Sequence, residues 1–315
     1  MSAAEKIINS DKPKKMGILA GGGHLPSIVI NACKAQGIDV FIVAFEGHTR
    51  SDILDDHPHV WTRMGAVGKI LRILRSEGIS DLVMIGNVRR PSLKELRPDL
   101  KAAAFFAKTG FKAFGDDGLL KSLRHFLEVE GFKLHGAHTL AQQLLAPEGT
   151  LTTRRPIRSD LISIERGIEV LEGLSALDVG QAVVVQEGLV LGVEAVEGTD
   201  ALIERCGSLK RSGRGGVLIK LCKVDQDRDL DLPTIGPSTV ERCVEAGLSG
   251  IIIHAGQSLL LHKEEVIELA KQKHREKLLK KCEPIKTISS VYGMGIYDAR
   301  NEPILNKRIR WPDEI

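Results

Sequence analysis

Residues 16–26 read MGILAGGGHLP, and this stretch decides the fold of the first half of the chain. Its first five residues form an apolar run that predicts a short buried strand, and the glycines Gly21, Gly22 and Gly23 follow directly. Apolar residues with helical spacing extend over 27–36, and a second apolar strand is expected at 40–45. Strand, glycine turn, helix and strand in this order predict a right-handed βαβ unit with parallel strands.

The same alternation continues through the first half of the chain. Helices are expected at 68–77, 102–114 and 117–130, and strands at 81–85 and 131–134. This pattern predicts an α/β fold with an open, doubly wound parallel sheet.

The second half of the chain has a different pattern and predicts a second α/β domain. Strands expected at 182–186 and 189–196 are separated by a Glu-Gly turn, which predicts an antiparallel hairpin and therefore a mixed sheet. A polar stretch with proline and glycine separates the two halves and is the best linker candidate. The expected organisation is a first domain at 1–146, a linker at 147–156, a smaller domain at 157–282 and an irregular C-terminal extension at 283–315.

Composition excludes several classes of protein. The 315 residues include 44 Lys and Arg against 41 Asp and Glu, a net charge of +3, which is too small for a protein that coats nucleic acid. Aromatic residues are 4% of the chain, which argues against a platform for stacking bases. We therefore expect no nucleic-acid partner.

Cysteine usage and the N-terminal residues indicate the compartment. The five cysteines form no C-x-x-C pair, which argues against a disulfide framework or a zinc site and favours a reducing compartment. The first 15 residues are polar and lack the apolar core of a signal peptide. No apolar stretch approaches the roughly 18 residues of a membrane span. We expect a cytoplasmic protein.

Two glycine-containing loops are candidate ligand sites at the carboxyl ends of strands. The triplet Gly21, Gly22 and Gly23 either lets backbone amides approach a phosphate or is only a tight structural turn. It is not a P-loop, because no lysine stands at the required position. Asn87 and Arg90 follow the strand at 81–85, where Arg90 is suited to bind a phosphate. The alternative for this second loop is a solvated surface turn.

Acidic residues are the candidates for catalysis or metal binding. Asp116 stands in a Gly-Asp-Asp-Gly loop that could hold a divalent ion, whereas the neighbouring Asp117 is equally suited to cap a helix. Glu194 and Glu197 follow a strand, and only a bend at its end would let both converge. Asp231 lies between two leucines, where a carboxylate partly removed from water needs a cation or a hydrogen-bonding partner. Asp231 is therefore the best single candidate for chemistry.

Other motifs narrow the choice of reaction. His138 follows a short strand and a Gly-Ala pair, so it is a candidate ligand-binding residue. The sequence contains no G-x-S-x-G, H-E-x-x-H or H-x-H-x-D motif. A serine hydrolase, a zinc protease and a calcineurin-like phosphoesterase therefore lack support.

Taken together, these segments resemble the LpxI-type UDP-2,3-diacylglucosamine pyrophosphatases. Each segment is a weak signal alone, but all of them in this order are specific. One departure concerns Asp229, which stands where relatives commonly carry arginine before the Asp-Leu-Pro-Thr segment. The residues that carry the resemblance are 17–23 with Leu25 and Pro26, 86–88 with Arg90 and Pro91, 115–117, 136–138, 178–181, 193–195, 197–200 and 231–236.

The resemblance implies a fold and an activity. It implies a Rossmann-like N-terminal domain, a smaller α/β C-terminal catalytic domain and a lipid nucleotide bound between them. The implied reaction is metal-dependent hydrolysis of UDP-2,3-diacylglucosamine to UMP and 2,3-diacylglucosamine 1-phosphate in lipid A biosynthesis, usually with Mg²⁺. The family's essential carboxylate falls on Asp231. The alternatives are hydrolysis of another nucleotide diphosphate sugar and a non-catalytic nucleotide-binding regulator, which the departure at Asp229 keeps open.

The hypothesis assigns a role to each candidate residue. Asp231 binds the metal or orients the water, and Glu194 or Glu197 completes the metal shell. Several basic residues in the C-terminal segment are expected to allow peripheral contact with the inner membrane, and a homo-oligomer is a further possibility. The candidate substrate-binding residues are Gly21, Gly22, Gly23, Asn87, Arg90, Asp116, His138, Thr199, Lys220, Lys223, Gln226 and Thr234.

Overall fold

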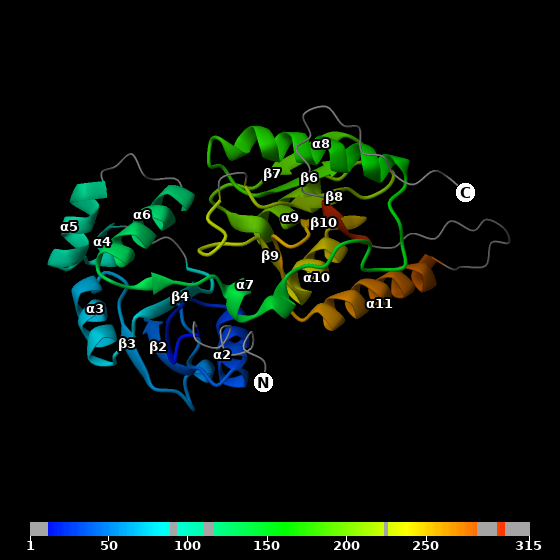
Figure 1. The fold of residues 1–315 in the computed structure, drawn as a ribbon. Coiled ribbons are helices and arrows are strands. Elements are labelled where there is room, and N and C mark those ends of the chain that lie inside the picture. Colours follow the sequence, from blue (N-terminus) through cyan, green and yellow to red (C-terminus); the bar gives the residue numbers. More distant parts are fainter. Residues whose placement is uncertain (1–11, 89–92, 110–115, 224–225, 282–294, 300–315) are drawn as a thin grey trace, which may run out of the picture. The chain divides into compact units, whose positions relative to one another are not determined.

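The computed structural model describes residues 12–88, 93–109, 116–223, 226–281 and 295–299 (Figure 1). The chain forms two compact units, each with its own sheet. Two short segments from the second half of the chain belong to the first unit. Unit 1 comprises Met1–Leu145, Leu174–Val179 and Lys223–Thr234, and unit 2 comprises Ala146–Gly173, Gly180–Cys222 and Ile235–Ile315.

Unit 1 is built on a five-stranded sheet in the order β3-β2-β1-β4-β5, in which every pair is parallel. This order confirms the predicted doubly wound sheet, because the chain leaves β1 first toward one edge and later toward the other. Strand β3 was not expected, since a short edge strand with exposed residues has no continuous apolar run. The strands are β1 (Lys15–Ala20), β2 (Asp39–Phe45), β3 (His59–Thr62), β4 (Asp81–Ile85) and β5 (Lys133–Leu134).

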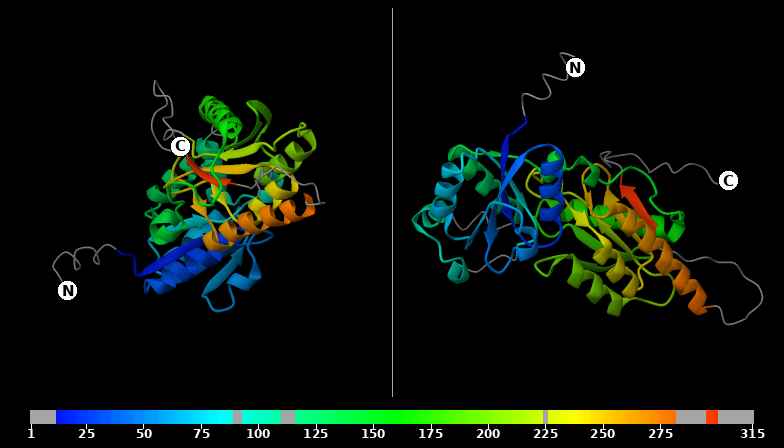
Figure 2. Two further views of the ribbon diagram at one scale, coloured as in Figure 1. Left: turned by 90° about the vertical axis from the view of Figure 1, so that its right-hand side faces the viewer. Right: turned by 90° about the horizontal axis from the view of Figure 1, so that it is seen from below.

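Helices cover both faces of this sheet, with α2 on one face and α3 on the other (Figure 2). On the α3 face, Phe41 and Val43 of β2 pack with Leu71 and Leu74 of α3 in one buried cluster. Alternate residues of each strand point to opposite faces of the sheet. Because helices cover both faces, nearly every residue of a central strand must be apolar. The helices are α2 (Leu25–Ala35), α3 (Val67–Ser76), α4 (Leu93–Leu96), α5 (Leu100–Thr109), α6 (Asp116–Val129) and α7 (Ala137–Leu140), with 3₁₀ turns η1 (Ser51–Ile53) and η2 (Gln142–Leu144).

Unit 2 is built on a mixed sheet in the order β12-β10-β8-β6-β7, as predicted for the second domain. The strands β8, β10 and β12 are parallel, whereas β6 is antiparallel to both of its neighbours. Residues 295–299 correct one expectation, because they form β12 within the extension that was expected to be irregular. The strands are β6 (Ala182–Gln186), β7 (Leu189–Val193), β8 (Val217–Lys220), β10 (Gly250–His254) and β12 (Gly295–Ala299), with a separate pair β9 (Thr234–Ile235) and β11 (Leu259–Leu260).

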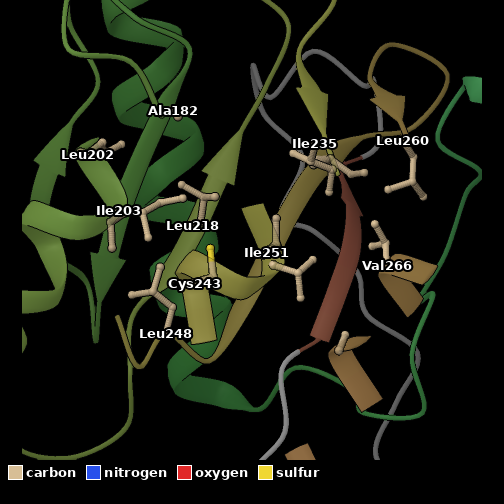
Figure 3. Close-up of a cluster of buried hydrophobic side chains, with 14 of the residues drawn as sticks. Ala182, Leu202, Ile203, Leu218, Ile235, Cys243, Leu248, Ile251, Leu260 and Val266 are labelled. Carbon is tan, nitrogen blue, oxygen red and sulfur yellow. The ribbon is translucent and has the colours of Figure 1, made fainter. Parts of the chain in front are cut away.

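Strand β6 shows how the sequence alternates between the two faces of this sheet. Ala182 and Val184 pack in the cluster formed with α9, α10 and α11, part of which Figure 3 shows. Val183 and Val185 pack in a second cluster, with α8. No helix among the described residues is long and apolar enough to span a membrane. The helices are α8 (Arg158–Ser175), α9 (Gly198–Leu209), α10 (Pro237–Glu245) and α11 (Lys263–Lys281).

Candidate functional site

The loops after the central strands β1 and β4 are joined through their backbones. The amide of Gly22 donates to the carbonyl of Asn87 at 2.8 Å, and the amide of Asn87 donates back to the carbonyl of Gly22 at 2.9 Å. The strands are parallel neighbours, so their carboxyl ends meet at one edge of the sheet. Ligands of doubly wound sheets bind at this edge, where the chain changes direction between β1 and β4.

Close packing of these loops explains two of the glycines. A Cβ atom at Gly21 would lie 2.7 Å from the carbonyl oxygen of Gly86, and one at Gly22 would lie 2.9 Å from the carbonyl oxygen of His48. Both neighbours are backbone atoms, so a side chain at either position forces the loops apart. Gly23 has a backbone φ of +85°, which L side chains rarely adopt. The triplet therefore has a structural role of its own, whether or not it also binds a phosphate.

The segment that carries Asp231 forms a turn within unit 1. The backbone carbonyl of Asp227 accepts hydrogen bonds from the amides of Leu230 and Asp231, each at 3.1 Å. The carboxylate of Asp227 accepts a further hydrogen bond from the amide of Asp229 at 3.1 Å. Leu230 packs against the buried cluster on the α3 face of the first sheet. Asp227 thus closes the turn at whose end Asp231 stands.

Arg124 of α6 connects this turn to unit 1. Its Nη1 atom lies 2.7 Å from each carboxylate oxygen of Asp227 and 3.2 Å from Asp229 Oδ2. Its Nε atom donates to Glu128 at 2.9 Å. The hydrogen bond to Glu128 first, and those to Asp227 and Asp229 next, raise the pKa of Arg124 above its ordinary value. The guanidinium therefore pairs with two carboxylates of the turn, and its hydrogen bonds among the described residues do not include Asp231.

Hydrogen bonds also join Asp231 to other predicted site residues. The side-chain amide of Gln226 donates to Asp231 Oδ2 at 2.9 Å, and its carbonyl oxygen accepts from the amide of Lys223 at 3.0 Å. The Nζ atom of Lys223 pairs with Asp178 Oδ1 at 2.5 Å. Thr234, after the turn, donates from its hydroxyl to the carbonyl of Leu232 at 3.0 Å. The structure therefore brings Asp231, Gln226 and Lys223 together.

His138 lies next to the same turn. It follows β5, and its Nε2 atom is 3.9 Å from Asp229 Oδ1. Its Nδ1 atom is buried and has no hydrogen-bond partner among the described residues. Gly136 makes room for this arrangement, since a Cβ there would lie 2.5 Å from the His138 ring and 2.7 Å from Asp229.

In unit 2, a buried network joins three predicted site residues. The amino group of Lys220 donates to the hydroxyl of Thr199 at 2.9 Å, and this hydroxyl donates to Glu194 Oε1 at 2.6 Å. The other oxygen of Glu194 accepts from the amide of Gln181 at 3.0 Å. Only 6% of Glu194 and 7% of Lys220 are exposed. Buried charges of this kind persist only when they are hydrogen-bonded, and here Thr199 supplies the bridge.

Glu197 has different partners from Glu194. Its carboxylate pairs with Arg205 at 2.8 Å and accepts from the amide of Ala195 at 3.1 Å. Backbone hydrogen bonding within Glu197 itself, followed by Arg205, lowers the pKa of this carboxyl. The two glutamates therefore enter separate hydrogen-bonding arrangements on the same loop.

Several predicted residues fall outside this account. Arg90 and all the basic residues beyond 281 lie outside the described residues. Asp116 begins α6, but its side chain also lies outside the described part of the chain.

The residues that sequence reasoning missed are Arg124 and Asp178. Arg124 gives no signal in the sequence, because it is one of several basic residues on an amphipathic helix. Asp178 belongs to a segment that carries the family resemblance, and its backbone φ of +53° lies in the left-handed region, which aspartate adopts more readily than most residues other than glycine. Its role became visible only through the ion pair with Lys223.

The carboxylates were tested as ligands for a divalent cation. Within the described ranges, no three His, Cys, Asp or Glu side chains come together as a metal-binding group. Asp227 and Asp229 share an ion pair with Arg124, and Glu197 pairs with Arg205. Magnesium commonly uses only one or two carboxylates together with substrate phosphates. The donor set therefore fits a cation that arrives with a phosphorylated substrate better than a cation held by protein ligands alone.

Comparison with known proteins gives a consistent result. Family models described as the LpxI N-terminal domain and the LpxI C-terminal domain match residues 15–144 and 147–275. The UDP-2,3-diacylglucosamine pyrophosphatase LpxI of Caulobacter vibrioides is 37% identical over 264 residues, which are 82% of this chain and 94% of that protein.

Solved structures overlap the chain only in part. The Bordetella bronchiseptica enzyme WbmG in complex with NAD is 15% identical over 39% of this chain and 36% of its own, with a TM-score of 0.27. The Mycobacterium tuberculosis structure described as glycinamide-RNase-transformylase T is 14% identical over 57% of this chain and 43% of its own, with a TM-score of 0.22. The chain spans less than half of either structure, and TM-scores this low do not define a shared fold.

Proposed function

The chain belongs to the LpxI family, and from this premise we propose that it hydrolyses the pyrophosphate bond of UDP-2,3-diacylglucosamine in lipid A biosynthesis. The products are UMP and 2,3-diacylglucosamine 1-phosphate. The proposal rests above all on the 37% identity to a pyrophosphatase of that name across 94% of its length. Because models of both LpxI domains match, the proposal concerns the whole reaction rather than one binding domain.

Asp231 is the proposed catalytic residue. Hydrolysis of a phosphoanhydride needs a water molecule aimed in line with the leaving group and groups that offset the charge on the phosphate oxygens. A carboxylate can orient that water or bind a cation. Support comes from the hydrogen bond of 2.9 Å from Gln226, which holds one oxygen of Asp231, and from the turn closed by Asp227, which holds its backbone.

Basic residues and strand-end loops are proposed to bind the diphosphate and the nucleotide. Lys220, Lys223 and Arg90 would offset the diphosphate charge. The glycine triplet and Asn87 would receive part of the nucleotide or the sugar phosphate, helped by Asp116 and His138. Thr199, Gln226 and Thr234 are the remaining proposed binding residues. Supporting this assignment, the glycine triplet and Asn87 lie where ligands of doubly wound sheets bind.

A divalent cation, with Mg²⁺ as the candidate, is part of the proposal. Asp231 would hold it together with substrate phosphates, and either Glu194 or Glu197 is the further proposed ligand. When bound, such a cation offsets charge on the pyrophosphate oxygens. Lys220 and Lys223 would add fixed positive charge of their own, and Gln226 would keep the Asp231 carboxylate in one orientation.

The product-release assay tests the function directly. The full chain is incubated with UDP-2,3-diacylglucosamine in two separate reactions, one containing Mg²⁺ and the other EDTA. The UMP released in each is measured by chromatography. We expect UMP and the lipid 1-phosphate in equal amounts with Mg²⁺ and little UMP with EDTA. Parallel reactions with UDP-N-acetylglucosamine test the alternative substrate class. Binding of the lipid nucleotide without release of UMP under any metal condition would contradict the proposal and favour a regulator.

Peripheral contact with the inner membrane is the second part of the proposal. The substrate carries two acyl chains, and the sequence beyond residue 281 contains a short basic run, Lys307, Arg308 and Arg310, of the kind that attracts anionic lipid surfaces. Co-sedimentation with vesicles, with and without anionic lipid, measures this contact. Equal recovery in the supernatant with both vesicles would contradict it.

A further inference from the structure

An apolar contact and an ionic contact both hold the turn that carries Asp231 against the rest of unit 1. Leu230 packs against the buried cluster that includes Leu82 and Leu127. Arg124 reaches the turn across 103 positions of sequence and holds both carboxylate oxygens of Asp227 at 2.7 Å. The ionic contact is the more directional of the two, because hydrogen bonds fix an angle and apolar packing does not.

Asp227 links Arg124 to the backbone of Asp231. Its carboxylate binds Arg124 and also accepts from the amide of Asp229 at 3.1 Å. Its carbonyl accepts from the amide of Asp231 at 3.1 Å. A change in the orientation of the Asp227 side chain therefore breaks its hydrogen bond with the Asp229 amide, two residues before Asp231, and loosens the turn from which Asp231 projects.

Building on the proposed function, we propose that Arg124 is a positioning residue for hydrolysis: by fixing Asp227 it holds the Asp227–Asp231 turn and so fixes the orientation of the Asp231 carboxylate. Arg124 acts through Asp227, since its hydrogen bonds among the described residues go to Asp227, Asp229 and Glu128. This role is distinct from binding the diphosphate, because the guanidinium is occupied by carboxylates.

The role is kinetic rather than structural for two reasons. The side chain of Arg124 is 26% exposed and that of Asp227 is 17% exposed, so water can replace the contact when it is lost. The Leu230 packing remains when the charge is removed, and it keeps the turn attached to the core. A misplacement of about 1 Å at a reacting group lowers a rate by roughly 100-fold without requiring loss of the fold.

The test compares Arg124→Gln with Glu128→Gln under steady-state conditions with UDP-2,3-diacylglucosamine. Glu128→Gln removes the charge of one partner of the guanidinium but keeps an acceptor oxygen, whereas only Arg124→Gln removes the contact with Asp227. We expect Arg124→Gln to lower kcat by about 30-fold or more while KM stays within about threefold, since binding groups are untouched. Glu128→Gln should stay within about twofold of wild type, and Arg124→Lys should recover part of the lost kcat.

A second arm asks whether Arg124 acts through Asp231. In an Asp231→Asn background, adding Arg124→Gln should leave the residual rate unchanged, because a positioning effect has nothing left to position. A further loss of residual rate in the double variant would overturn the proposal. So would a kcat for Arg124→Gln within twofold of wild type, or a loss confined to KM. If the wild-type chain releases no UMP, the proposed function itself is refuted. That outcome is distinct from failure of the positioning role, which is seen only in the variants of an active wild type.

Discussion

Gly22 and Asn87 form an isolated antiparallel bridge between the loops that follow two parallel strands. The bridge brings the backbones of β1 and β4 so close beyond their carboxyl ends that Gly21 and Gly86 have no room for side chains. The glycines are therefore needed for packing, and the ligand-binding role proposed for the loop would depend on that packed geometry.

Gly21→Ala should destabilise unit 1. Its new Cβ would meet the backbone of Gly86 and Asn87 at 2.7–2.8 Å, and backbone cannot move aside as a flexible side chain can. We expect a loss of about 1–3 kcal/mol in the free energy of unfolding, measured by urea denaturation followed by circular dichroism. Gly173→Ala is the matched control, because Gly173 lies in α8 and its Cβ would meet no atom within 4 Å. This control should stabilise its helix by about 1 kcal/mol; equal effects of the two variants would contradict the packing explanation.

Asp231→Asn should abolish catalysis without unfolding the chain. Asparagine keeps the size of the side chain and an oxygen that accepts the Gln226 hydrogen bond, but it loses the charge that orients water or a cation. We expect kcat for UMP release to fall by at least about 100-fold, with lipid-nucleotide affinity measured by calorimetry nearly unchanged. Asp56→Asn, at an exposed position, serves as the control. Full activity of Asp231→Asn would remove Asp231 from the mechanism.

Thr199→Val should weaken unit 2 by removing the bridge between Lys220 and Glu194. Valine has nearly the same shape but no hydroxyl, so two buried charged groups each lose a hydrogen bond of 2.9 or 2.6 Å. We expect a loss of about 1–3 kcal/mol in the free energy of unfolding. Thr199→Ser keeps the hydroxyl and should lose much less. If serine and valine destabilise equally, the methyl packing rather than the hydrogen bonds accounts for the loss.

Glu130→Gln should reduce the dependence of stability on acid pH. Hydrogen bonds from Lys101 and then Arg75 lower the pKa of Glu130 below its ordinary value of 4.5. The unfolded chain therefore takes up this proton at a higher pH than the folded chain does. The stabilisation is present above the ordinary value and is lost as the pH falls through the lower pKa of the folded protein.

The measurement is the melting temperature between pH 7 and pH 3. Wild type and the exposed-site control Glu46→Gln should lose more stability over this range than Glu130→Gln. At pH 7 the Glu130 variant should itself be less stable by roughly 1 kcal/mol, because the pair is only partly buried. Parallel pH curves for Glu130→Gln and wild type would show that this ion pair contributes nothing to acid stability.

The candidate site was partly predictable from local sequence. Asp231 was singled out because a carboxylate between leucines needs compensation, and its contact with Gln226 supplies a hydrogen bond of that kind. The roles of Lys223 and Asp178 were not predictable, because their ion pair joins two segments 45 positions apart. The role of Arg124 was not predictable for the same reason. The sequence of an amphipathic helix does not indicate which of its basic residues will contact an aspartate far away in the chain.

Sequence patterns predicted one parallel and one mixed sheet of the α/β class, but not the short edge strands β3 and β12. Apolar runs of four to seven residues, separated by helical periodicity and glycine turns, leave few alternatives, since each strand must bury both faces. Tertiary structure alone decided that residues 223–234 belong with unit 1, that Gly22 bonds to Asn87, and that Arg124 holds the Asp231 turn. Local sequence patterns predict which side chains are buried. The partner that a buried side chain contacts depends instead on how distant segments of the chain come together in the folded structure.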